Sequence, residues 1–437
     1  MLFTIFVFLI LLGILVFVHE LGHFVTARRL GVKADEFGFG FPPRIFGVQF
    51  VKKSQIASKT VETIETAISQ DKSNKTDIIS AAVVDATITV SQIEREKKWR
   101  VIWGNRDTKE LTAEGNSDWG TIYSLNWIPL GGFVKIKGED GEHKNETDSF
   151  ASQKIWKRGA ILSAGVAMNV VLCAAALMLA FMIGAPQIVD SVKSAGVKIR
   201  DEKIQVISIL KNSPAANAGI QLGDAIQEID GKKMNKVEEV QSYVQSKDKQ
   251  EIAVGVERLG QKLIYKIQPV VLKETQKPGL GVGLARTGIV SYPWYKAIWF
   301  GIRDTYYLGE QIIVAFAKII KNAVIGEPLG VDVAGPVGIA VMTGQVARMG
   351  FIYILQFVAL LSLNLAIINF LPFPALDGGR VLFLIIEKIR GRAVNQKIEQ
   401  ITHSVGFALL MVLVLIVTSR DIMKFKDFFI NLWQKIN

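Results

Sequence analysis

Two histidines and a glutamate stand within five residues near the N-terminus of this 437-residue chain, in the sequence Val18-His19-Glu20-Leu21-Gly22-His23-Phe24. Side chains four residues apart lie on one face of a helix, so His19 and His23 can each present an imidazole nitrogen to one metal ion. Glu20 follows the first histidine directly, where its carboxylate can reach a water bound to that ion. This H-E-x-x-H pattern is typical of zinc hydrolases, in which one helical turn supplies two ligands and a general base.

The motif lies in an apolar segment. No charged residue occurs from Met1 to Val18, and the next one after Glu20 is Arg28. Ionisable groups inside a membrane cost on the order of 3 kcal/mol each and usually serve function. A purely structural role for these polar side chains is the alternative, and their ligand spacing argues against it.

Composition indicates a membrane protein with soluble parts. The chain is 50% hydrophobic and 21% charged, which fits several spans joined to sizeable polar regions. Its one cysteine, Cys173, lies in an apolar run, so there is neither a disulfide framework nor a thiolate metal site. The net charge of +11 comes from lysines and arginines that flank apolar runs, which is a pattern of membrane topology rather than of nucleic-acid binding.

Four apolar stretches are long enough to span a membrane, and they divide the chain. The first has no Lys or Arg before its apolar run and is followed by Arg28 and Arg29, which argues against a cleaved secretory signal. The predicted parts are a first span at 1–27, a cytoplasmic or membrane-reentrant β region at 28–157 with a polar insertion at 51–118, a second span at 158–185, a soluble domain at 186–285, an amphipathic segment at 286–348, a third span at 349–390, a fourth span at 400–419 and a tail at 420–437.

Positive charges beside the spans indicate their orientation. They follow span one, precede span two and lie between spans three and four, so these sites are predicted to be cytoplasmic. The N-terminus, the 190–348 region and the C-terminus are then outside. The tail is basic too, and its aromatic residues from Phe425 to Trp433 are typical of an amphipathic helix on the membrane surface. Residues 292–325, rich in Trp and Tyr, predict a similar helix on the outer surface.

Residues 36–50 alternate aromatic residues with glycine at a period of two, which predicts a strand with one apolar face. Gly38 and Gly40 suit a close approach to another backbone. The predicted partner strand lies at 120–137. The insertion between the two strands contains strand-like runs at 81–93 and 99–103.

The third span carries the second half of the candidate site. Pro372 and Pro374 break its helix and free backbone groups, which is tolerated in a membrane only where the chain is buried in protein or lines a polar cavity. Asp377 follows this break. Because catalytic zinc takes three protein ligands and a water, Asp377 is the natural third ligand. Spans one and three are predicted to run in the same direction, and His19 then lies about 12 Å from the cytoplasmic end at ~1.5 Å per residue. Asp377 lies near the cytoplasmic end of span three, within reach of a similar depth if the broken segment loops back.

Four other residues have competing interpretations. In the second span, Gly165 allows close helix packing, and Asn169 needs a hydrogen-bond partner, either on another helix or on a substrate backbone. His143 lies in a charged loop and is predicted to be solvated. His403, near the start of span four, is a weaker candidate ligand without a ligand-type neighbour, and packing or an interface is its predicted role.

Residues 186–285 predict a small domain. Their order is a strand, a short helix capped by Ser213, a second strand, a hairpin turn at Asp230, an amphipathic helix and a hairpin. This order resembles a PDZ domain of the bacterial, circularly permuted type. The resemblance implies that Gly279-Leu280-Gly281-Val282 is the carboxylate-binding loop, beside which a peptide C-terminus adds as a strand. A plain glycine-rich linker is the alternative.

Together these residues resemble the site-2 protease family of intramembrane zinc metalloproteases, most closely its bacterial RseP-type branch. The matching motifs are His19-Glu20-Leu21-Gly22-His23, Gly-Gly-Phe-Val-Lys at 131–135, and the stretch from Asn364 to Gly378 that ends in Leu-Asp-Gly. The resemblance covers nearly the whole chain outside 51–118, and it departs from the family in that enlarged insertion and in the single PDZ domain. It implies a polytopic α-helical protein of the bacterial inner membrane, with four transmembrane helices, a membrane-reentrant β-sheet and one extracytoplasmic PDZ domain.

The resemblance also implies roles for individual residues. Zinc is held by His19, His23 and Asp377, and Glu20 is the base. The strands at 36–50 and 120–137 handle the substrate. The implied substrate-binding residues are Gly38, Gly40, Gly131, Gly132, Asn364 and Asn369.

The predicted function is cleavage, with Zn²⁺ as cofactor, of transmembrane segments of single-span membrane proteins, such as a trimmed anti-sigma factor or a remnant signal peptide. The alternative is a membrane-anchored PDZ adaptor whose metal site is not catalytic. A structural zinc site is usually closed by four protein ligands, whereas three strong candidates are visible. A transporter is a second alternative, favoured by the broken third span and disfavoured because the sequence has no inverted repeat.

Overall fold

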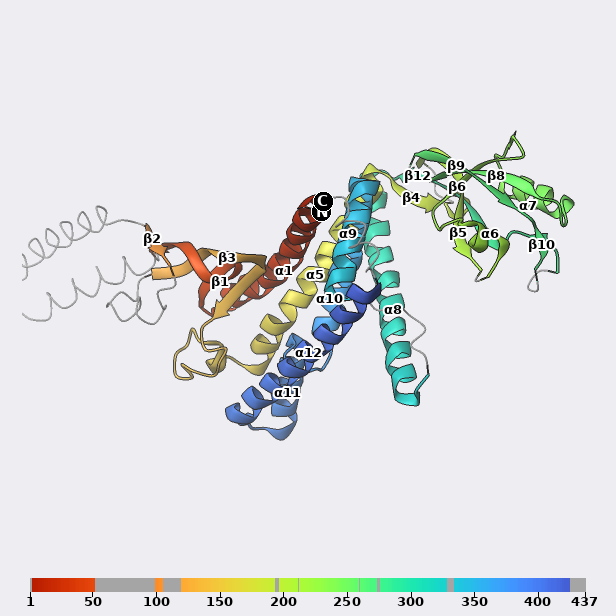
Figure 1. Cartoon of the computed structure of the whole chain (residues 1–437). Helices are drawn as coiled ribbons and strands as arrows, with labels where there is room; N and C mark the ends of the chain where they lie inside the picture. The colour runs from red at the N-terminus through yellow and green to blue at the C-terminus, as the bar shows by residue number, and fades with distance from the viewer. Residues whose placement is uncertain are drawn as a thin grey trace, which may run out of the picture. The chain divides into compact units, whose positions relative to one another are not determined.

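The computed structural model describes residues 2–51, 99–104, 119–192, 196–210, 212–258, 260–272, 276–327 and 334–424 (Figure 1). The chain divides into two compact units. The first comprises Met1–Leu172, Gln311–Gly344 and Leu361–Asn437, and the second comprises Cys173–Glu310 and Gln345–Leu360. Two predicted features, the strand-like run at 81–93 and the tail helix from Phe425 to Trp433, lie outside the described residues.

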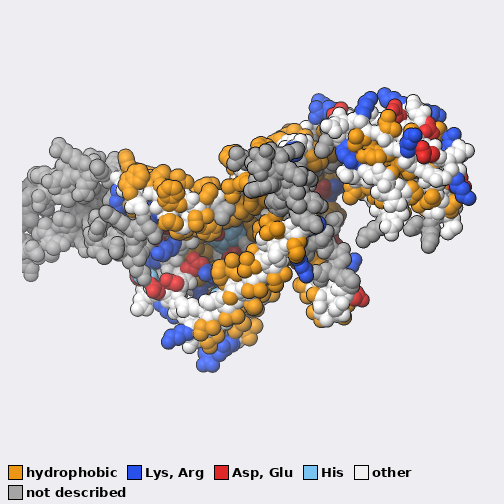
Figure 2. Space-filling view, viewed as in Figure 1, with side chains coloured by type: hydrophobic (Ala, Val, Ile, Leu, Met, Phe, Trp, Pro, Cys, Tyr) orange, Lys and Arg blue, Asp and Glu red, His pale blue; other side chains and the backbone are white. Residues whose placement is uncertain are grey.

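Four helices are long and apolar enough to cross a membrane, as predicted: α1 (Leu2–Arg29), α5 (Ile155–Ile183), α10 (Phe351–Phe370) and α12 (Gln396–Lys424). Hydrophobic side chains gather over the helices, and charged side chains are frequent over the sheet of the second unit (Figure 2). Leu413 and Leu415 of α12, for example, are exposed. Exposed apolar residues in such number fit contact with lipid rather than with water.

The first unit contains an antiparallel sheet of β1 (Ala34–Val51), β2 (Trp99–Trp103) and β3 (Trp119–Ile136), in the order β2-β1-β3. Both long strands bend. Phe37 pairs with Tyr123, in the first arm of β3, and with Val134, in its second arm. The first half of β1 therefore lies between these two arms, of which the second contains Gly131 and Gly132. The second half pairs with β2 and with the first arm of β3. The structure therefore confirms the predicted pairing of 36–50 with 120–137.

Helix α1 packs against this sheet. Phe24 stacks on Phe37 of β1 with ring centroids 4.6 Å apart. A Cβ added at Gly131 of β3 would lie 2.5 Å from Cβ of Val16, so only glycine allows β3 to approach the helix this closely. The second arm of β3 is thus held beside the turn of α1 that precedes His19.

The third span is interrupted as predicted. Helix α10 ends at Phe370, and α11 (Asp377–Arg390) begins after the Pro-Phe-Pro segment. The interruption folds back closely on the first turn of α11. A Cβ at Gly378 would lie 2.3 Å from the carbonyl oxygens of Phe370 and Leu371, and one at Gly379 would lie 2.3 Å from the carbonyl oxygen of Phe373. Only glycine at 378 and 379 allows the backbone of residues 370–373 to pack this closely on the first turn of α11. Asp377 is the first residue of that helix.

The second unit is built around a seven-stranded sheet in the order β4-β12-β5-β6-β8-β9, with β7 paired to β6. Its strand and helix order follows the prediction for a permuted PDZ domain. Strand β12 continues to Ser291, beyond the predicted domain end at 285. The elements are β4 (Ala185–Ile188), η2 (Val189–Ser191), β5 (Lys198–Ile209), α6 (Pro214–Ala218), β6 (Ala225–Ile229), β7 (Lys232–Lys233), α7 (Val237–Ser246), β8 (Ile252–Arg258), β9 (Gln261–Ile267), β10 (Val270–Val271), β11 (Pro278–Gly279) and β12 (Val282–Ser291).

Local signals explain this domain. Ser213 caps α6 by accepting a hydrogen bond from the Ala216 N–H at 3.2 Å, and Gly219 ends the helix in a left-handed conformation. The carboxylate of Asp224 is fully buried and accepts two hydrogen bonds of 2.7 Å from Arg258. The pKa of the Arg258 guanidinium is raised, chiefly because of the hydrogen bonds to this carboxylate.

The predicted amphipathic segment forms α8 (Trp294–Ile325), followed by α9 (Pro336–Met349). In the second unit, α8 packs along the end of α5. A Cβ at Gly301 would lie 3.1 Å from the Ala174 carbonyl oxygen, and Oγ1 of Thr305 is 3.6 Å from Sγ of Cys173. The helix itself is confirmed, and its position on the outer membrane surface stays a prediction. One further 3-10 helix, η1 (Phe150–Ser152), precedes α5.

Candidate metal centre

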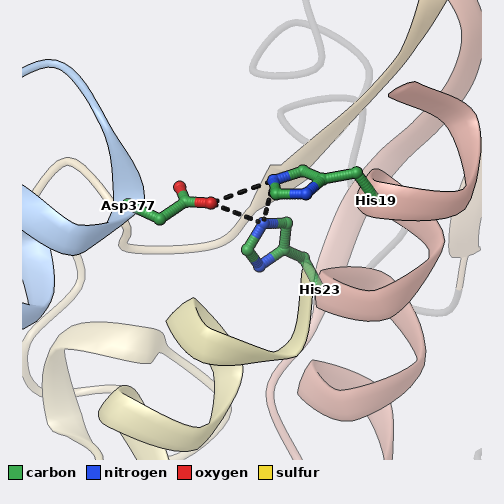
Figure 3. Close-up of side chains that lie close together, drawn as sticks. All are labelled: His19, His23 and Asp377. Atoms are coloured by element: carbon green, nitrogen blue, oxygen red, sulfur yellow. Dashed lines mark hydrogen bonds and ion pairs between the residues drawn. The ribbon is translucent and has the colours of Figure 1, made fainter. Parts of the chain in front are cut away.

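The three predicted ligands meet in the first unit (Figure 3). His19 and His23 come from one face of α1, and Asp377 is the first residue of α11. Oδ2 of Asp377 lies 2.9 Å from Nε2 of His19 and 3.4 Å from Nε2 of His23. The two Nε2 atoms are 3.2 Å apart. Both histidines are buried, and the carboxylate is partly exposed.

This triangle of atoms fits zinc. In a tetrahedral zinc site with bonds of about 2.0 Å, two ligand atoms lie about 3.3 Å apart. The distances between 2.9 and 3.4 Å are therefore close to three edges of one tetrahedron. Among the described residues, this is the one group of three or more His, Cys, Asp or Glu side chains close enough to hold a metal. Three protein ligands leave a fourth position for water, which is the arrangement of catalytic sites.

Hydrogen bonds to the outer ring nitrogens determine which nitrogen of each histidine is available to a metal ion. Nδ1 of His23 lies 2.8 Å from the carbonyl oxygen of Ile161 on α5, so Nδ1 carries the proton and donates it, and Nε2 is free to bind a cation. Ile161 is itself fully buried in a core with Leu162, Ala27 and Leu384. A packed core of α1, α5 and α11 thus fixes the second histidine.

Asn169 of α5 supports His19. Its Nδ2 lies 3.3 Å from Nδ1 of His19, and its Oδ1 is buried without a partner among the described residues. If the amide is turned about its axis, Oδ1 accepts the Nδ1–H of His19, and this unpartnered atom is satisfied. That arrangement again leaves Nε2 as the ligand nitrogen. The sequence pointed to Asn169 as a residue in need of a partner, but not to His19 as that partner.

Gly165, one turn before Asn169 on α5, keeps the space beside the imidazoles open. A Cβ there would lie 2.4 Å from Nε2 of His23 and 2.7 Å from Nε2 of His19. These are the two nitrogens of the candidate metal site, so any side chain at this position would crowd it. The sequence suggested helix packing for Gly165, and its place beside the ligand atoms emerges only from the structure.

Glu20 directly follows His19 on α1. It is half-buried and is within electrostatic reach of His19, His23 and Asp377. Glu139, from the loop after β3, is a further carboxylate near Glu20. Glu20 is not a member of the group of three possible metal ligands.

The other two histidines lie outside this cluster. His143 is exposed and contacts Glu146 at 2.5 Å, in line with the predicted solvated role. Nδ1 of His403 accepts a hydrogen bond from the Ala375 N–H at 2.9 Å. His403 is thus a neighbour of the segment that carries Asp377 and not a ligand.

The residues predicted to bind substrate occupy two places. Asn364 and Asn369 lie on α10 and are partly exposed. The glycines lie in the sheet, where close contacts require them. A Cβ at Gly38 would lie 2.5 Å from Oγ of Ser124, one at Gly40 would lie 2.7 Å from the Ile128 carbonyl oxygen, and one at Gly132 would lie 3.0 Å from the Gly38 carbonyl oxygen. Their contact with a substrate stays a prediction.

The predicted carboxylate-binding loop precedes β12. Leu280 is buried, and its carbonyl oxygen accepts the Ala215 N–H at 3.0 Å. Gly281 has a φ of 75°, and its carbonyl oxygen accepts the Leu210 N–H at 2.9 Å. The loop is therefore an ordered part of the domain rather than an exit linker, and peptide binding to it stays a prediction.

Comparisons with known proteins agree with this chemistry. Residues 7–73 and 112–413 match the model of peptidase family M50. The chain is 32% identical to a zinc metalloprotease, RasP, of Bacillus licheniformis, over 96% of this chain and 99% of that protein. It is 30% identical to the regulator of sigma-W protease RasP of Bacillus subtilis, over 96% of this chain and 98% of that protein.

Among solved structures, the chain is similar to the PDZ domain of the SdrC-like protein from Listeria monocytogenes. The identity is 25%, the match covers 20% of this chain and 92% of that chain, and the TM-score is 0.19. With so low a TM-score, the PDZ-like character of the second unit rests on its own strand order.

Proposed function

This chain belongs to peptidase family M50, and we propose that it is an intramembrane zinc metalloprotease in which His19, His23 and Asp377 hold the zinc and Glu20 is the general base. The observation that carries the proposal is the triangle of ligand atoms, 2.9 to 3.4 Å on a side, formed by an apolar helix and a broken one. The zinc metalloproteases named among its relatives match nearly the whole chain.

Zinc, when bound, lowers the pKa of a coordinated water to about 7 and polarises the carbonyl to be cut. The protein supplies the rest. His19 and His23 present Nε2 because their Nδ1 atoms are engaged by Asn169 and Ile161. Glu20 accepts a proton from the attacking water at its carboxylate and later delivers it to the leaving amine.

The substrate must be unwound where it is cut, because a helical carbonyl is shielded and already hydrogen-bonded. We propose that an unwound segment pairs with the second arm of β3. This arm lies against α1 at Val16 and Phe17, immediately before the ligand turn, and contains Gly131 and Gly132. Added strands satisfy backbone groups that would otherwise be unpaired in lipid. Asn364 and Asn369 of α10, together with Gly38 and Gly40, are proposed to complete the substrate site.

The proposed substrates are single-span membrane proteins. A protease named as a regulator of sigma-W is similar over nearly the full chain, which favours regulated proteolysis, for example of a trimmed anti-sigma factor, and remnant signal peptides are a second source of such segments. The PDZ-like domain is proposed to receive new C-termini at Gly279 to Val282. The proposed location is the bacterial inner membrane as a multi-pass protein, with the active site toward the cytoplasm and the PDZ-like domain outside.

Cleavage of a tagged single-span protein by purified enzyme in detergent with zinc tests this proposal. Wild type is expected to produce two fragments, and Glu20→Gln is expected to lose at least about 100-fold in rate, because general-base catalysis contributes that much. Zinc content of the two proteins should be equal. Turnover retained by Glu20→Gln would show that another group is the base.

A further inference from the structure

The irregular segment between α10 and α11 decides where Asp377 points. Pro372 and Pro374 have no backbone N–H, and Ala375 adopts a left-handed φ of 78°. Alanine rarely takes this conformation, and it persists only where the surrounding structure holds it. Whatever holds this segment therefore bears on the third ligand.

Helix α12 contacts this segment through two residues on one face, His403 and Gly406. Nδ1 of His403 accepts a hydrogen bond from the backbone N–H of Ala375 at 2.9 Å. Gly406 is buried, and a Cβ added there would lie 2.4 Å from Cβ and 2.6 Å from the carbonyl oxygen of Pro374. Because residues three apart on a helix are neighbours, the hydrogen bond and the close contact act together on consecutive residues of the break.

The hydrogen bond, rather than packing, distinguishes histidine at this position. The imidazole of His403 packs 5.5 Å from the ring of Phe383 on α11, which an apolar side chain could do as well. Since Nδ1 accepts, the proton of the neutral ring is on Nε2. Nε2 is buried with no partner among the described residues, and His403 lines a cavity of about 620 Å³ that has room for water. A buried Nε2–H without a partner costs free energy. The hydrogen bond from Ala375 to Nδ1 is therefore a reason for a histidine at this position.

We propose that His403 and Gly406 are positioning residues that aim Asp377 at the two zinc-binding histidines. This inference rests on the proposed role of Asp377 as the third ligand. Asp377 follows Ala375 by two residues, and its Oδ2 already lies 2.9 and 3.4 Å from the imidazole nitrogens. Ligand distances in zinc sites fall within about 0.2 Å of their usual values, so the position of the carboxylate matters. Release of Ala375 from His403 therefore weakens zinc binding without removing any ligand.

A rescue series on the full-length protein in detergent tests this role, with the zinc dissociation constant measured by chelator competition. His403→Leu keeps an apolar body against Phe383 but removes the acceptor. His403→Asn restores an acceptor, since Oδ1 of asparagine is as many bonds from Cα as Nδ1 of histidine. We expect about 10-fold weaker zinc binding for His403→Leu, which is typical of a lost supporting hydrogen bond, and nearly wild-type binding for His403→Asn. Ser404→Ala, on the exposed side of the same turn, is the matched control.

Asp377→Asn is measured beside the series, so that the role of Asp377 as a ligand and the positioning role of His403 are tested separately. If Asp377→Asn binds zinc like wild type, the premise fails and the inference with it. If Asp377→Asn loses zinc but His403→Leu keeps it, the positioning role alone is wrong. Equal weakening by His403→Leu and His403→Asn also overturns it, because packing would then be the cause. Should His403→Leu not fold, Gly406→Ala replaces it, and unchanged zinc affinity there contradicts the proposal.

Discussion

Substitution of Gly165 by alanine tests the geometry of the metal centre with a single methyl group. The added Cβ would lie 2.4 Å from Nε2 of His23 and 2.7 Å from Nε2 of His19. An ordinary contact needs about 3.4 Å, so the helix or the imidazole ring must move by about 1 Å, which is about five times the displacement of 0.2 Å that a zinc site tolerates. A misplacement of about 1 Å at a catalytic centre costs about 100-fold in rate.

We therefore expect Gly165→Ala to fold and insert normally, because alanine is the better helix former, and to lose about 100-fold in activity, bound zinc or both. Zinc per chain is measured by atomic emission, and cleavage of a single-span substrate is measured in parallel. Gly159→Ala on the same helix is the control, since its Cβ would meet only Cδ1 of Leu384 at 4.0 Å. If Gly165→Ala kept one zinc per chain and more than half of the wild-type activity, the arrangement of α1 and α5 described above would be wrong.

Three other results are expected. Asn169→Leu removes the hydrogen-bond partner of His19 and should weaken zinc binding about 10-fold in chelator competition, and an unchanged affinity would refute its supporting role. Removal of zinc by a chelator should abolish cleavage, and added zinc should restore it, whereas activity that survives chelation would point to different chemistry. Asp224→Ala leaves Arg258 without its buried partner and should lower the Tm of the PDZ-like domain by on the order of 10 °C in calorimetry, while exposed Asp248→Ala should not.

The grouping of His19, His23 and Asp377 could be predicted from the sequence, because its signals are local. His19, Glu20 and His23 share one helical turn, and the Pro-Phe-Pro segment predicts the helix break before Asp377. Spans one and three were predicted to run in the same direction, and the ligand residues that they carry do meet in the structure.

The supporting residues were not predictable, because their roles depend on how whole helices are rotated. Gly165 and Asn169 face the histidines only through the orientation of α5 around its axis, which a helix that is apolar on nearly every side does not reveal in its sequence pattern. His403 meets Ala375 across 28 positions of chain. The double pairing of Phe37 with both arms of β3 likewise depends on bends in both strands, which period-two alternation does not encode.

In the second unit, the elements that begin or end at typical capping and turn residues could be predicted from the sequence. Ser213 indicates the start of α6, and the turn at Asp230 indicates the end of β6. The end of that domain was less well marked, since β12 runs on to Ser291 without a breaking residue at 285.

We propose that this metalloprotease cuts inside the membrane, at the depth where its proposed zinc ligands lie. The measurement that tests it most directly is the mass of both fragments of a single-span substrate cleaved by the enzyme in lipid vesicles, with Glu20→Gln as the inactive reference. The scissile bond is predicted to fall within the apolar segment, about 12 Å from its cytoplasmic end at ~1.5 Å per residue. A bond in the polar flank of the substrate, or fragments that also form with Glu20→Gln, would contradict it.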